Sequence, residues 1–371
     1  MVARGPGAVG CAHCTKLGAV VACAVCKHLV CDACAADWST CDEPSGRMFQ
    51  LGRGRTLIDV DPGGRFGLVE HWPRQAALVD LRALRWIDEP NLPVLRAGDI
   101  TPRLTAGNRL IYADVRVVDA PYTSLVMSSL PVIGKLELSD LPNPVRCTGV
   151  SLVGDRYFYV TDTEQIAVVS PRPADPILLG QFPSTAMFMT VTFEPLPKKV
   201  VQAAHVDGAR DLLATGTWGE ITLHRIVDSK LVLVGHVPTT GDTVWVAVAG
   251  ACLAAIVKGG AQRGLTVWRL GSDDSIRDVA LHLDRKVHAA ALSRDGRFLA
   301  AAVEHDDIVV HDLVDGSSVT FDEHTDDVTL VRFAGPDQLL VTADKDHRVV
   351  VRPRSPSGYA RVVMPATLAD A

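Results

Sequence analysis

The sequence predicts an all-β protein in which a row of small antiparallel sheets follows a short cysteine-rich segment. A strand, turn and strand signature recurs from Thr56 onward, and seven of the nine cysteines lie between Cys11 and Cys41. In addition, 47% of the 371 residues are hydrophobic, which is enough for a large buried core. We therefore expect two parts, a small N-terminal domain over residues 9–44 and a large β domain over residues 46–366.

The repeating unit is clearest near the C-terminus. The segment VHAAALSRDGRFLAAAVEHDDIVVHDLVDGSSVTF (287–321) alternates apolar and other residues in four stretches, joined by Asp-Gly turns and a short polar loop. The segment DVTLVRFAGPDQLLVTADKDHRVVVRPR (327–354) repeats the pattern. A period of two is typical of strands with one buried face, and Asp-Gly is typical of tight hairpins. Each unit is therefore expected to form a small antiparallel sheet.

The signature occurs seven times along the chain. The glycines of the first hairpins are Gly63, Gly107, Gly154, Gly208, Gly250, Gly296 and Gly335. Their spacing varies from 39 to 54 residues, as in a divergent array of units with a period near 45. The longest interval indicates an insertion, which we expect at residues 184–199.

These units resemble WD repeats, the family in which each repeat forms one four-stranded blade of a β-propeller. The resemblance implies a seven-bladed propeller, a common size for this architecture. The family's Trp-Asp dipeptide at the end of the third strand is replaced by Val79-Asp80, His224-Arg225, Trp268-Arg269 and His311-Asp312, whereas Gly235-His236 matches its Gly-His dipeptide. In the last unit, His324 and Asp346 stand where the family's structural histidine and aspartate pair. The fourth strand of the last blade could come from residues 47–51 or from residues 361–364, and either choice would close the ring and remove an exposed edge.

The N-terminal cysteines form three consecutive C-x-x-C pairs and one further cysteine. They are Cys11, Cys14, Cys23, Cys26, Cys31, Cys34 and Cys41. A C-x-x-C turn supplies two of the four ligands that zinc prefers, whereas a disulfide framework is disfavoured in a reducing compartment. A redox motif would need a single pair that opens a helix. The spacing therefore predicts one or two structural zinc ions, which would stabilise a segment too short to fold on its core alone.

The order of the pairs resembles cross-brace zinc fingers, most closely the B-box. FYVE fingers share the middle block but add a distant fourth pair, and a RING would need a central C-x-H. The resemblance implies that Cys11, Cys14, Cys31 and Cys34 hold one zinc ion, and that Cys23, Cys26 and Cys41 hold another with an eighth ligand. Asp37, which lies between Cys34 and Cys41, is our candidate for that ligand, since a carboxylate oxygen can bind zinc. B-boxes normally use histidines here, and His28 and His13 are the rivals.

Charge and hydropathy limit the classes of partner. A net charge of −6 gives no basic excess for a nucleic-acid backbone, and no apolar run has the length of a membrane span. No signal peptide precedes Cys11, so we expect a cytoplasmic protein. The preference for arginine over lysine, 28 to 9, and the three asparagines indicate a bacterial, GC-rich genome. The isolated Cys147 and Cys252 lie in apolar surroundings and are expected to be buried.

Motifs of catalysis are absent from the sequence, which contains no G-x-S-x-G, no phosphate-binding P-loop and no H-E-x-x-H. The acidic segments 304–312 and 322–327 fit turn positions of the repeat. We therefore expect a non-enzymatic scaffold that binds a protein or peptide through the propeller face lined by its second-to-third-strand loops. The residues expected on that face are His71, Trp72, Arg74, Trp218, Glu220, Gln262, Arg263, His305, Asp306, Lys345 and His347. The alternative is a metal-dependent hydrolase or lyase with its site in the central funnel. Tripartite-motif ubiquitin ligases also carry B-boxes, but this chain lacks a RING and a coiled coil, so ligase activity does not follow.

Overall fold

The computed structural model describes residues 46–71, 75–87, 103–105, 109–114, 123–129, 135–141, 145–150, 157–161, 166–171, 188–192, 201–207, 209–227, 230–259, 263–304, 306–335, 339–355, 358–359 and 362–365. It also describes the short segments 9–10, 17–18, 20–22 and 29–31. These residues form strands and turns but no helix. The predicted all-β class is therefore confirmed. Within this part of the chain, nothing forms a helix long and apolar enough to cross a membrane.

Three four-stranded antiparallel sheets come first along the body of the chain, each with its strands in sequence order. The first contains β6 (Arg55–Val60), β7 (Phe66–His71), β8 (Gln75–Asp80) and β9 (Arg85–Ile87). The second contains β10 (Arg103–Thr105), β11 (Arg109–Asp114), β12 (Thr123–Ser129) and β13 (Lys135–Leu141). The third contains β14 (Val145–Val150), β15 (Tyr157–Thr161), β16 (Ile166–Pro171) and β17 (Phe188–Thr192). The expectation of an insertion at residues 184–199 is wrong in part, because β17 lies there and completes the third sheet.

A six-stranded sheet follows, and two of its strands are unusually long. It contains β18 (Val201–Asp207), β19 (Leu212–Val227), β20 (Lys230–Ala249), β21 (Cys252–Lys258), β22 (Gly264–Leu270) and β23 (Ile276–Leu283). The hydroxyls of Thr215 and Thr222 in β19 lie 2.6 Å apart. Seven residues of straight strand would span about 23 Å, so β19 folds back on itself between these residues. Its first half pairs with β18 and its second half with residues 230–238 of β20, while residues 242–249 of β20 pair with β21.

The last two sheets are built from the C-terminal third of the chain and one strand from the N-terminal side. The fifth sheet contains β24 (Val287–Leu292), β25 (Phe298–Val303), β26 (Asp307–Asp312) and β27 (Ser318–Phe321). The sixth contains β28 (Val328–Ala334), β29 (Leu339–Asp344), β30 (Arg348–Arg352), β5 (Gly46–Gln50) and β33 (Val362–Pro365), in that order. A short hairpin of β31 (Arg354–Ser355) and β32 (Gly358–Tyr359) lies between β30 and β33 along the chain.

Both segments proposed as the closing strand belong to the sixth sheet. β5 pairs antiparallel with β30, and β33 pairs parallel with the other edge of β5. The segment at residues 47–51 therefore supplies the fourth strand, and the C-terminal segment adds a fifth outside it. As a result, the strand from the N-terminal side is held between two strands of the C-terminal part.

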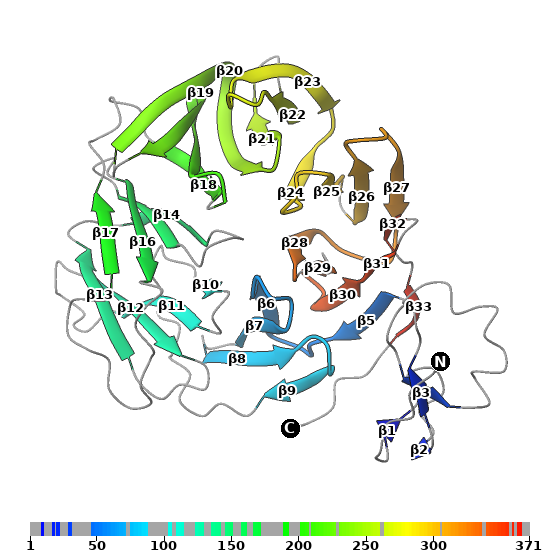
Figure 1. Ribbon diagram of the computed structural model, residues 1–371. Helices are drawn as coiled ribbons and strands as arrows, with labels where there is room; N and C mark the ends of the chain where they lie inside the picture. Colours follow the sequence, from blue (N-terminus) through cyan, green and yellow to red (C-terminus); the bar gives the residue numbers. More distant parts are fainter. Residues whose placement is uncertain are drawn as a thin grey trace.

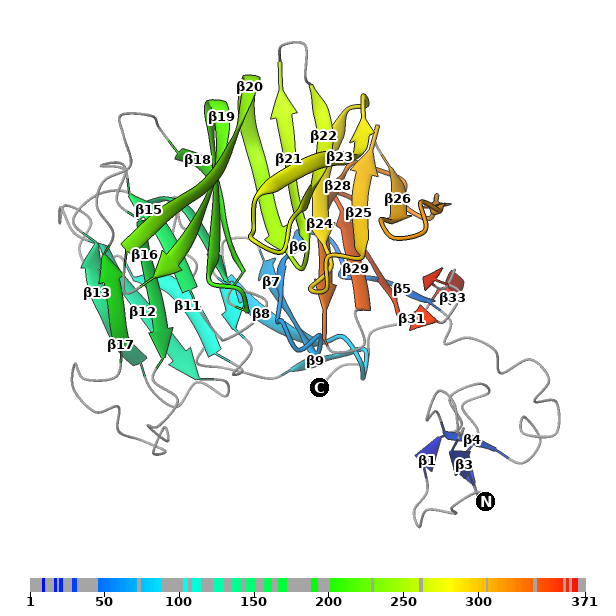
Figure 2. The same ribbon diagram turned by 45° about the horizontal axis from the view of Figure 1, so that its top comes forward.

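The sheets stand around a closed ring, as Figure 1 shows. Inner strands touch in a closed series around the ring: β6 contacts β10, β10 contacts β14, β14 contacts β18, β18 contacts β20 within the six-stranded sheet, β20 contacts β24, β24 contacts β28, and β28 contacts β6 again. At the closing point, the Gly335 amide donates to the Pro62 carbonyl at 2.8 Å. Figure 2 shows the sheets from a tilted view, standing side by side around the ring.

Apolar side chains fill the spaces between neighbouring sheets. One core cluster joins the sixth sheet to the first and includes Phe49, Leu57 and Val341. Others join β20–β22 to β24 and β25, and β25 and β26 to β28 and β29. Each fully buried Leu or Phe side chain contributes about 1.5–3 kcal/mol relative to an exposed one. Because these clusters lie between two sheets, the sheets that they join stabilise each other, and a further cluster lies within the six-stranded sheet.

Turn aspartates fix the ends of several strands. Asp61 accepts hydrogen bonds from the amides of Gly63 and Arg65 at 2.9 and 2.7 Å. Asp312 accepts from the Val314 amide at 2.9 Å and pairs with the Arg297 guanidinium at 2.6 Å. These are the local backbone bonds for which aspartate is favoured in turns. Asp312 therefore has a structural contact at the position where the repeat resembles the family's Trp-Asp dipeptide.

Candidate functional site

One face of the ring carries the loops from which we expected binding residues, and we call it the loop face. It consists of the connections from second to third strands and of the connections between sheets. Seven described candidates lie there: His71 ends β7, Trp218 and Glu220 lie at the fold-back of β19, Arg263 precedes β22, Asp306 precedes β26, and Lys345 and His347 lie between β29 and β30. Trp72, Arg74, Gln262 and His305 lie outside the described residues.

Trp218 occupies the tip of the fold-back in β19. Gly219 follows it with a φ of +87°, a conformation that favours glycine and allows the tight reversal. The Thr217 hydroxyl donates to the carbonyl oxygens of Trp218 and Glu220 at 3.3 and 3.2 Å, so the turn is held from within. The Trp218 side chain is 66% exposed, although tryptophan is normally among the more buried residues. A rigid turn therefore presents a large aromatic side chain to solvent.

The bend near the middle of β20 lies beside this turn. Trp218 pairs with Asp242 across the strands, and Thr239 and Gly241 form the bend just before Asp242. The Thr239 hydroxyl donates to the Gly241 carbonyl at 3.3 Å. The backbone around Trp218 is thus fixed on both sides, which lowers the entropy lost when a partner packs on the ring.

Charges on the loop face are unevenly distributed over two sectors. The exposed basic residues Lys258, Arg263, Arg285 and Lys286 lie at the ends of β21, β22 and β23, and one exposed carboxylate, Asp284, lies among them and pairs with Arg263 at 3.3 Å. The acidic sector lies on the next two sheets and contains Glu304, Asp306, Asp307, Asp322, Glu323, Asp326, Asp327 and Asp346. Desolvation and the charges of Asp306, Asp322 and Glu304 raise the pKa of Asp307. The carboxylates of this sector are therefore close enough to repel one another.

Lys345 and His347 are partly engaged in contacts within the fold. The Lys345 ammonium lies 2.5 Å from a carboxylate oxygen of Asp327. The Nε2 atom of His347 accepts a hydrogen bond from the Gly54 amide at 3.3 Å, and His347 has a φ of +65°. His347 therefore links the β29–β30 turn to the chain that enters the first sheet, in addition to lying on the loop face.

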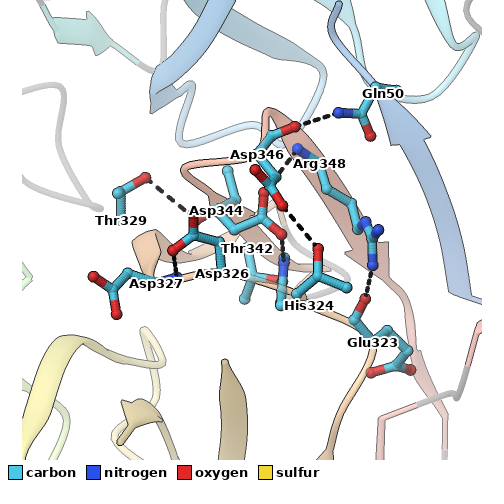
Figure 3. Close-up of polar contacts among 12 residues, drawn as sticks. Gln50, Glu323, His324, Asp326, Asp327, Thr329, Thr342, Asp344, Asp346 and Arg348 are labelled. Atoms are coloured by element: carbon cyan, nitrogen blue, oxygen red, sulfur yellow. Dashed lines mark hydrogen bonds and ion pairs between the residues drawn. The ribbon is translucent and has the colours of Figure 1, made fainter. Parts of the chain in front are cut away.

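A buried polar network lies beneath the acidic sector, as Figure 3 shows. His324 Nδ1 lies 2.9 Å from an Asp344 carboxylate oxygen, and His324 Nε2 lies 2.7 Å from the Thr342 hydroxyl. The side chains of His324 and Asp344 are fully buried. Because a carboxylate only accepts, His324 donates from Nδ1 to Asp344. Burial raises the pKa of Asp344, but hydrogen bonds from His324 and the Arg348 amide, with further contacts, outweigh it and lower that pKa below its usual value.

The sequence-based pairing of His324 with Asp346 is wrong. Thr342 and Asp344 are two residues apart on β29, so their side chains lie on the same face of the strand and both reach His324. Asp346 lies beyond the strand and is exposed, where it accepts from the Thr325 hydroxyl at 3.1 Å. The partner of His324 is therefore the aspartate two residues earlier, at the end of β29.

Arg352 extends this network and was missed from the sequence. Its guanidinium has no exposed surface and lies 2.5 Å from a Glu323 carboxylate oxygen, 3.3 Å from the Thr342 hydroxyl, and over the ring of Phe321. Arg352 ends β30, the third strand of its repeat. Trp268 and His311 occupy similar positions near the ends of β22 and β26, which are the third strands of their own repeats. Arginines are mostly exposed in proteins, and nothing in the segment Arg352-Pro353-Arg354 distinguishes Arg352 as a buried one.

Three side chains on inner strands meet near the point where the ring closes. Asp59 on β6 accepts from the Leu104 amide at 2.9 Å, and its other carboxylate oxygen lies 3.7 Å from Arg332 on β28. His205 on β18 accepts at Nδ1 from the Val248 amide at 3.3 Å. Burial, followed by the charge of Arg332, lowers the pKa of His205 to about 4. These contacts tie the first strands of different sheets to one another.

Among the residues whose side chains the structure describes, no three or more histidine, cysteine, aspartate or glutamate side chains lie close enough together to hold a metal ion. The expected zinc ligands Cys11, Cys14, Cys23, Cys26, Cys34, Asp37 and Cys41 lie outside the described residues, and of Cys31 only the backbone is described. Cys252, which is described, is buried as expected.

The short strands around the cysteines form two hairpins. β1 (Val9–Gly10) pairs antiparallel with β2 (Leu17–Gly18), and β3 (Val20–Ala22) pairs antiparallel with β4 (Leu29–Cys31). The connection within the first hairpin contains Cys11 and Cys14, and that within the second contains Cys23 and Cys26. β1 also contacts β4, which ends at Cys31. This donor set and this hairpin order fit zinc, since thiolates in C-x-x-C turns are its usual structural ligands.

Comparison with solved structures relates the ring of sheets to a known architecture. The crystal structure of the Cps50 (Swd1) β-propeller domain from Myceliophteria thermophila superposes with a TM-score of 0.58 and 12% sequence identity, covering 82% of this chain and 98% of that chain. The fold is a β-propeller. The expected propeller architecture is thereby confirmed. No model of a protein family and no curated protein sequence matches this chain.

The propeller gives the loop face a defined place in the molecule. In this architecture, sheets radiate from a central axis, and their loops form two opposite faces of a disc. Trp218 and both charged sectors lie on one of these faces, whereas the turns at Asp61, Asp295 and Asp312 lie at the opposite ends of the strands. Among the residues whose side chains the structure describes, the most exposed aromatic one and the uneven charges thus share a single face.

Proposed function

We propose that this protein is a non-enzymatic scaffold that binds a protein or peptide on the loop face of a seven-bladed propeller. The single observation that carries the proposal is the exposed Trp218 on a rigid turn. Tryptophan is enriched among the residues that contribute most to binding free energy, and fixed backbones lower the entropy cost of association. The mixed charges of the face favour a protein over a nucleic-acid backbone.

The proposed blade number is supported by the ring of inner strands. The closed series β6, β10, β14, β18, β20, β24 and β28 contains one first strand for each of the seven repeats. In this interpretation, the six-stranded sheet holds two blades, with β20 providing the last strand of one and the first strand of the next. The bend at Thr239–Gly241 marks the passage between them.

The two charged sectors suggest how a partner is oriented. A partner with basic residues over the acidic sector and acidic residues over Lys258, Arg263, Arg285 and Lys286 would match the face in potential. Such complementarity raises association rates and fixes orientation more than it raises affinity. The other loop-face candidates, Glu220, Asp306, Lys345 and His347, would then act mainly at the rim of the contact.

The test compares two exposed apolar residues on opposite faces. Trp218→Ala removes the proposed anchor, while Val314→Ala alters a 74% exposed residue in the turn between β26 and β27. Partners captured on the immobilised wild-type protein would be identified by mass spectrometry, and the strongest would be measured against each variant. We expect Trp218→Ala to weaken binding by at least about 30-fold and Val314→Ala to leave it unchanged. Equal binding by both variants would exclude Trp218 as the anchor.

We further propose that the N-terminal segment is a B-box-like finger with one or two zinc ions. Cys11, Cys14, Cys31 and Cys34 would hold the first ion, and Cys23, Cys26, Cys41 and Asp37 the second. The contact between β1 and β4 supports the first set, because it brings the strand before Cys11 next to the strand that ends at Cys31. Zinc there would supply folding free energy, not chemistry, because four protein ligands leave no open position.

A further inference from the structure

The outermost strand of one blade has an unusual free edge. Residues 230–238 of β20, which we call the outer strand, pair along one edge with residues 220–227 of β19. Along their other edge, no strand in the described part of the chain is paired with them. Strand edges with unpaired amides and carbonyls are templates for pairing with another strand, and proteins normally protect them.

The other outer strands carry such protection. β9, β17, β27 and β33 are only three to five residues long, and β33 ends in Pro365. β13 and β23 are longer but contain charged residues within the strand, at Glu137, Asp140, Arg277 and Asp278. The outer strand has the sequence KLVLVGHVP, in which Lys230 at its start and Pro238 at its end are protecting residues, but residues 231–237 between them include no permanent charge and no proline. The interior of this strand is therefore less protected against pairing than the interiors of β13 and β23.

Apolar side chains are exposed along the same strand. Val232 is 50% exposed and Leu233 is 57% exposed, and the neighbouring Val227 on β19, which pairs with Lys230, is also exposed. Adjacent residues of a strand normally point to opposite faces. The pair Val232 and Leu233 therefore offers apolar surface on both faces of the sheet at its edge, where a single added strand would cover both.

We propose that two copies of this protein associate through their outer strands, paired antiparallel about a two-fold axis at Val232, so that Leu231 of each copy lies opposite Leu233 of the other. Each Lys230 would then lie just outside the paired residues, and the two Lys230 residues would stand about 13 Å apart at opposite ends of the pair. No like charges face each other. The contact would cover the exposed apolar side chains of both copies with identical surfaces, as in an isologous dimer.

The structure also limits the association to two copies. A register shift between Leu223 and His224 leaves one extra residue, Val234, in β20, and such a bulge bends the strand. Pairing is thereby confined to residues 231–233. The opposite edge of this blade is β18, which faces neighbouring inner strands of the ring. Because each copy offers one such edge, the pairing closes as a dimer and does not extend into a fibre.

The small area of the contact predicts a weak, concentration-dependent dimer. Stable interfaces usually bury at least about 1,000 Å² in total, and one short strand pair provides less. Sedimentation velocity over a concentration series is therefore the appropriate measurement. We expect the mass of the wild-type protein to rise from one chain toward two as concentration increases.

Two lysine variants test where the contact lies. Leu233→Lys would place a charge within the pair and is expected to keep the protein as a single chain at every concentration. Val314→Lys is the control, because Val314 is exposed in a turn far along the chain from the outer strand, and it should associate like the wild type. Thermal unfolding of all three proteins shows that each is folded.

Amide hydrogen exchange gives an independent reading of the same contact. At high protein concentration, the amides of residues 231–233 should exchange more slowly in the wild type but not in Leu233→Lys. A wild type that stays a single chain throughout, or a Leu233→Lys variant that associates like the wild type, would overturn the proposal. Partner binding at Trp218 is a separate matter, because Trp218→Ala should still dimerise.

Discussion

His324 joins the connection after β27 to the strand β29 through Asp344 and Thr342, and the three side chains are almost completely buried. The carboxylate of Asp344 stabilises the fold only while it is ionised. Since its pKa is lowered in the folded state, its contribution is complete above the usual value near pH 4 and is lost as the pH falls through the lowered value. The last sheet should therefore be sensitive to acid.

Two neighbouring aspartates give a direct test at the residue scale. Asp344→Asn replaces a buried, charge-assisted acceptor and is expected to lower the free energy of unfolding by about 1.5–3 kcal/mol at pH 7. The difference from the wild type should begin to shrink below about pH 4 and should vanish once the pH falls below the lowered pKa, where the folded wild-type carboxylate is itself protonated. Urea unfolding at several pH values measures both effects.

Asp346→Asn is the control for this prediction. Asp346 is exposed and only two residues away, so its substitution should change the free energy of unfolding by no more than about 0.5 kcal/mol. If Asp346→Asn were the more damaging variant, the pairing inferred from the sequence would be correct and that seen in the structure wrong.

Residue patterns show why one such partner could be predicted and another could not. His324 itself was predicted, because it stands where WD repeats carry their structural histidine. Arg352 was not, because its burial depends on Glu323 and Phe321, which lie about thirty residues earlier and reach it only through the fold. Exposure of Trp218 was predictable from the glycine that follows it, since a two-residue turn leaves no neighbour to cover the ring.

At the scale of elements, the alternation of apolar residues predicts strands well when both faces are in contact with other sheets. β24–β30 follow the expected strands closely, including the turns at Asp295-Gly296 and Asp315-Gly316. β17 was taken for part of an insertion because the longest interval between the hairpin glycines falls there. The fold-back of β19 was expected as a loop, whereas Trp218 and Gly219 make it a two-residue turn.

The closing strand β5 provides a prediction at this scale. Phe49 on β5 pairs with Val349, is 2% exposed, and lies in the core between the last and first sheets. Phe49→Ala removes a buried aromatic ring and is expected to lower the free energy of unfolding by about 3–5 kcal/mol. Gln50→Ala, on the exposed side of the same strand, should cost no more than about 0.5 kcal/mol. Chemical denaturation of both variants gives the comparison, and equal stability would show that β5 does not close the ring.

For the whole molecule, a repeat period could be recognised although the repeat's signature residues are largely replaced. The ring requires only that each unit present two apolar faces and short turns, and many sequences satisfy this, as the 12% identity to a propeller of similar fold illustrates. The residues of the loop face do not have to follow this apolar pattern. The sequence could therefore predict which residues lie on that face, because topology decides it, but only the structure shows which of them contact one another.

Zinc content is the property of the whole molecule that separates the proposed scaffold from a metal-dependent enzyme. The cysteines of the N-terminal segment are the set of donors that the sequence offers at zinc-ligand spacing. Purified full-length protein should therefore contain one or two zinc ions per chain, as measured by inductively coupled plasma mass spectrometry. A truncated chain of residues 45–371 keeps β5 and the entire ring, and we expect it to remain folded and to contain no zinc. In the full chain, joint replacement of Cys11 and Cys14 by serine should remove at least one ion without changing the unfolding of the propeller, because the finger is stabilised by its metal and the ring by its cores. Zinc that persists in the truncated chain would instead place the metal within the propeller and favour a hydrolase or lyase site there.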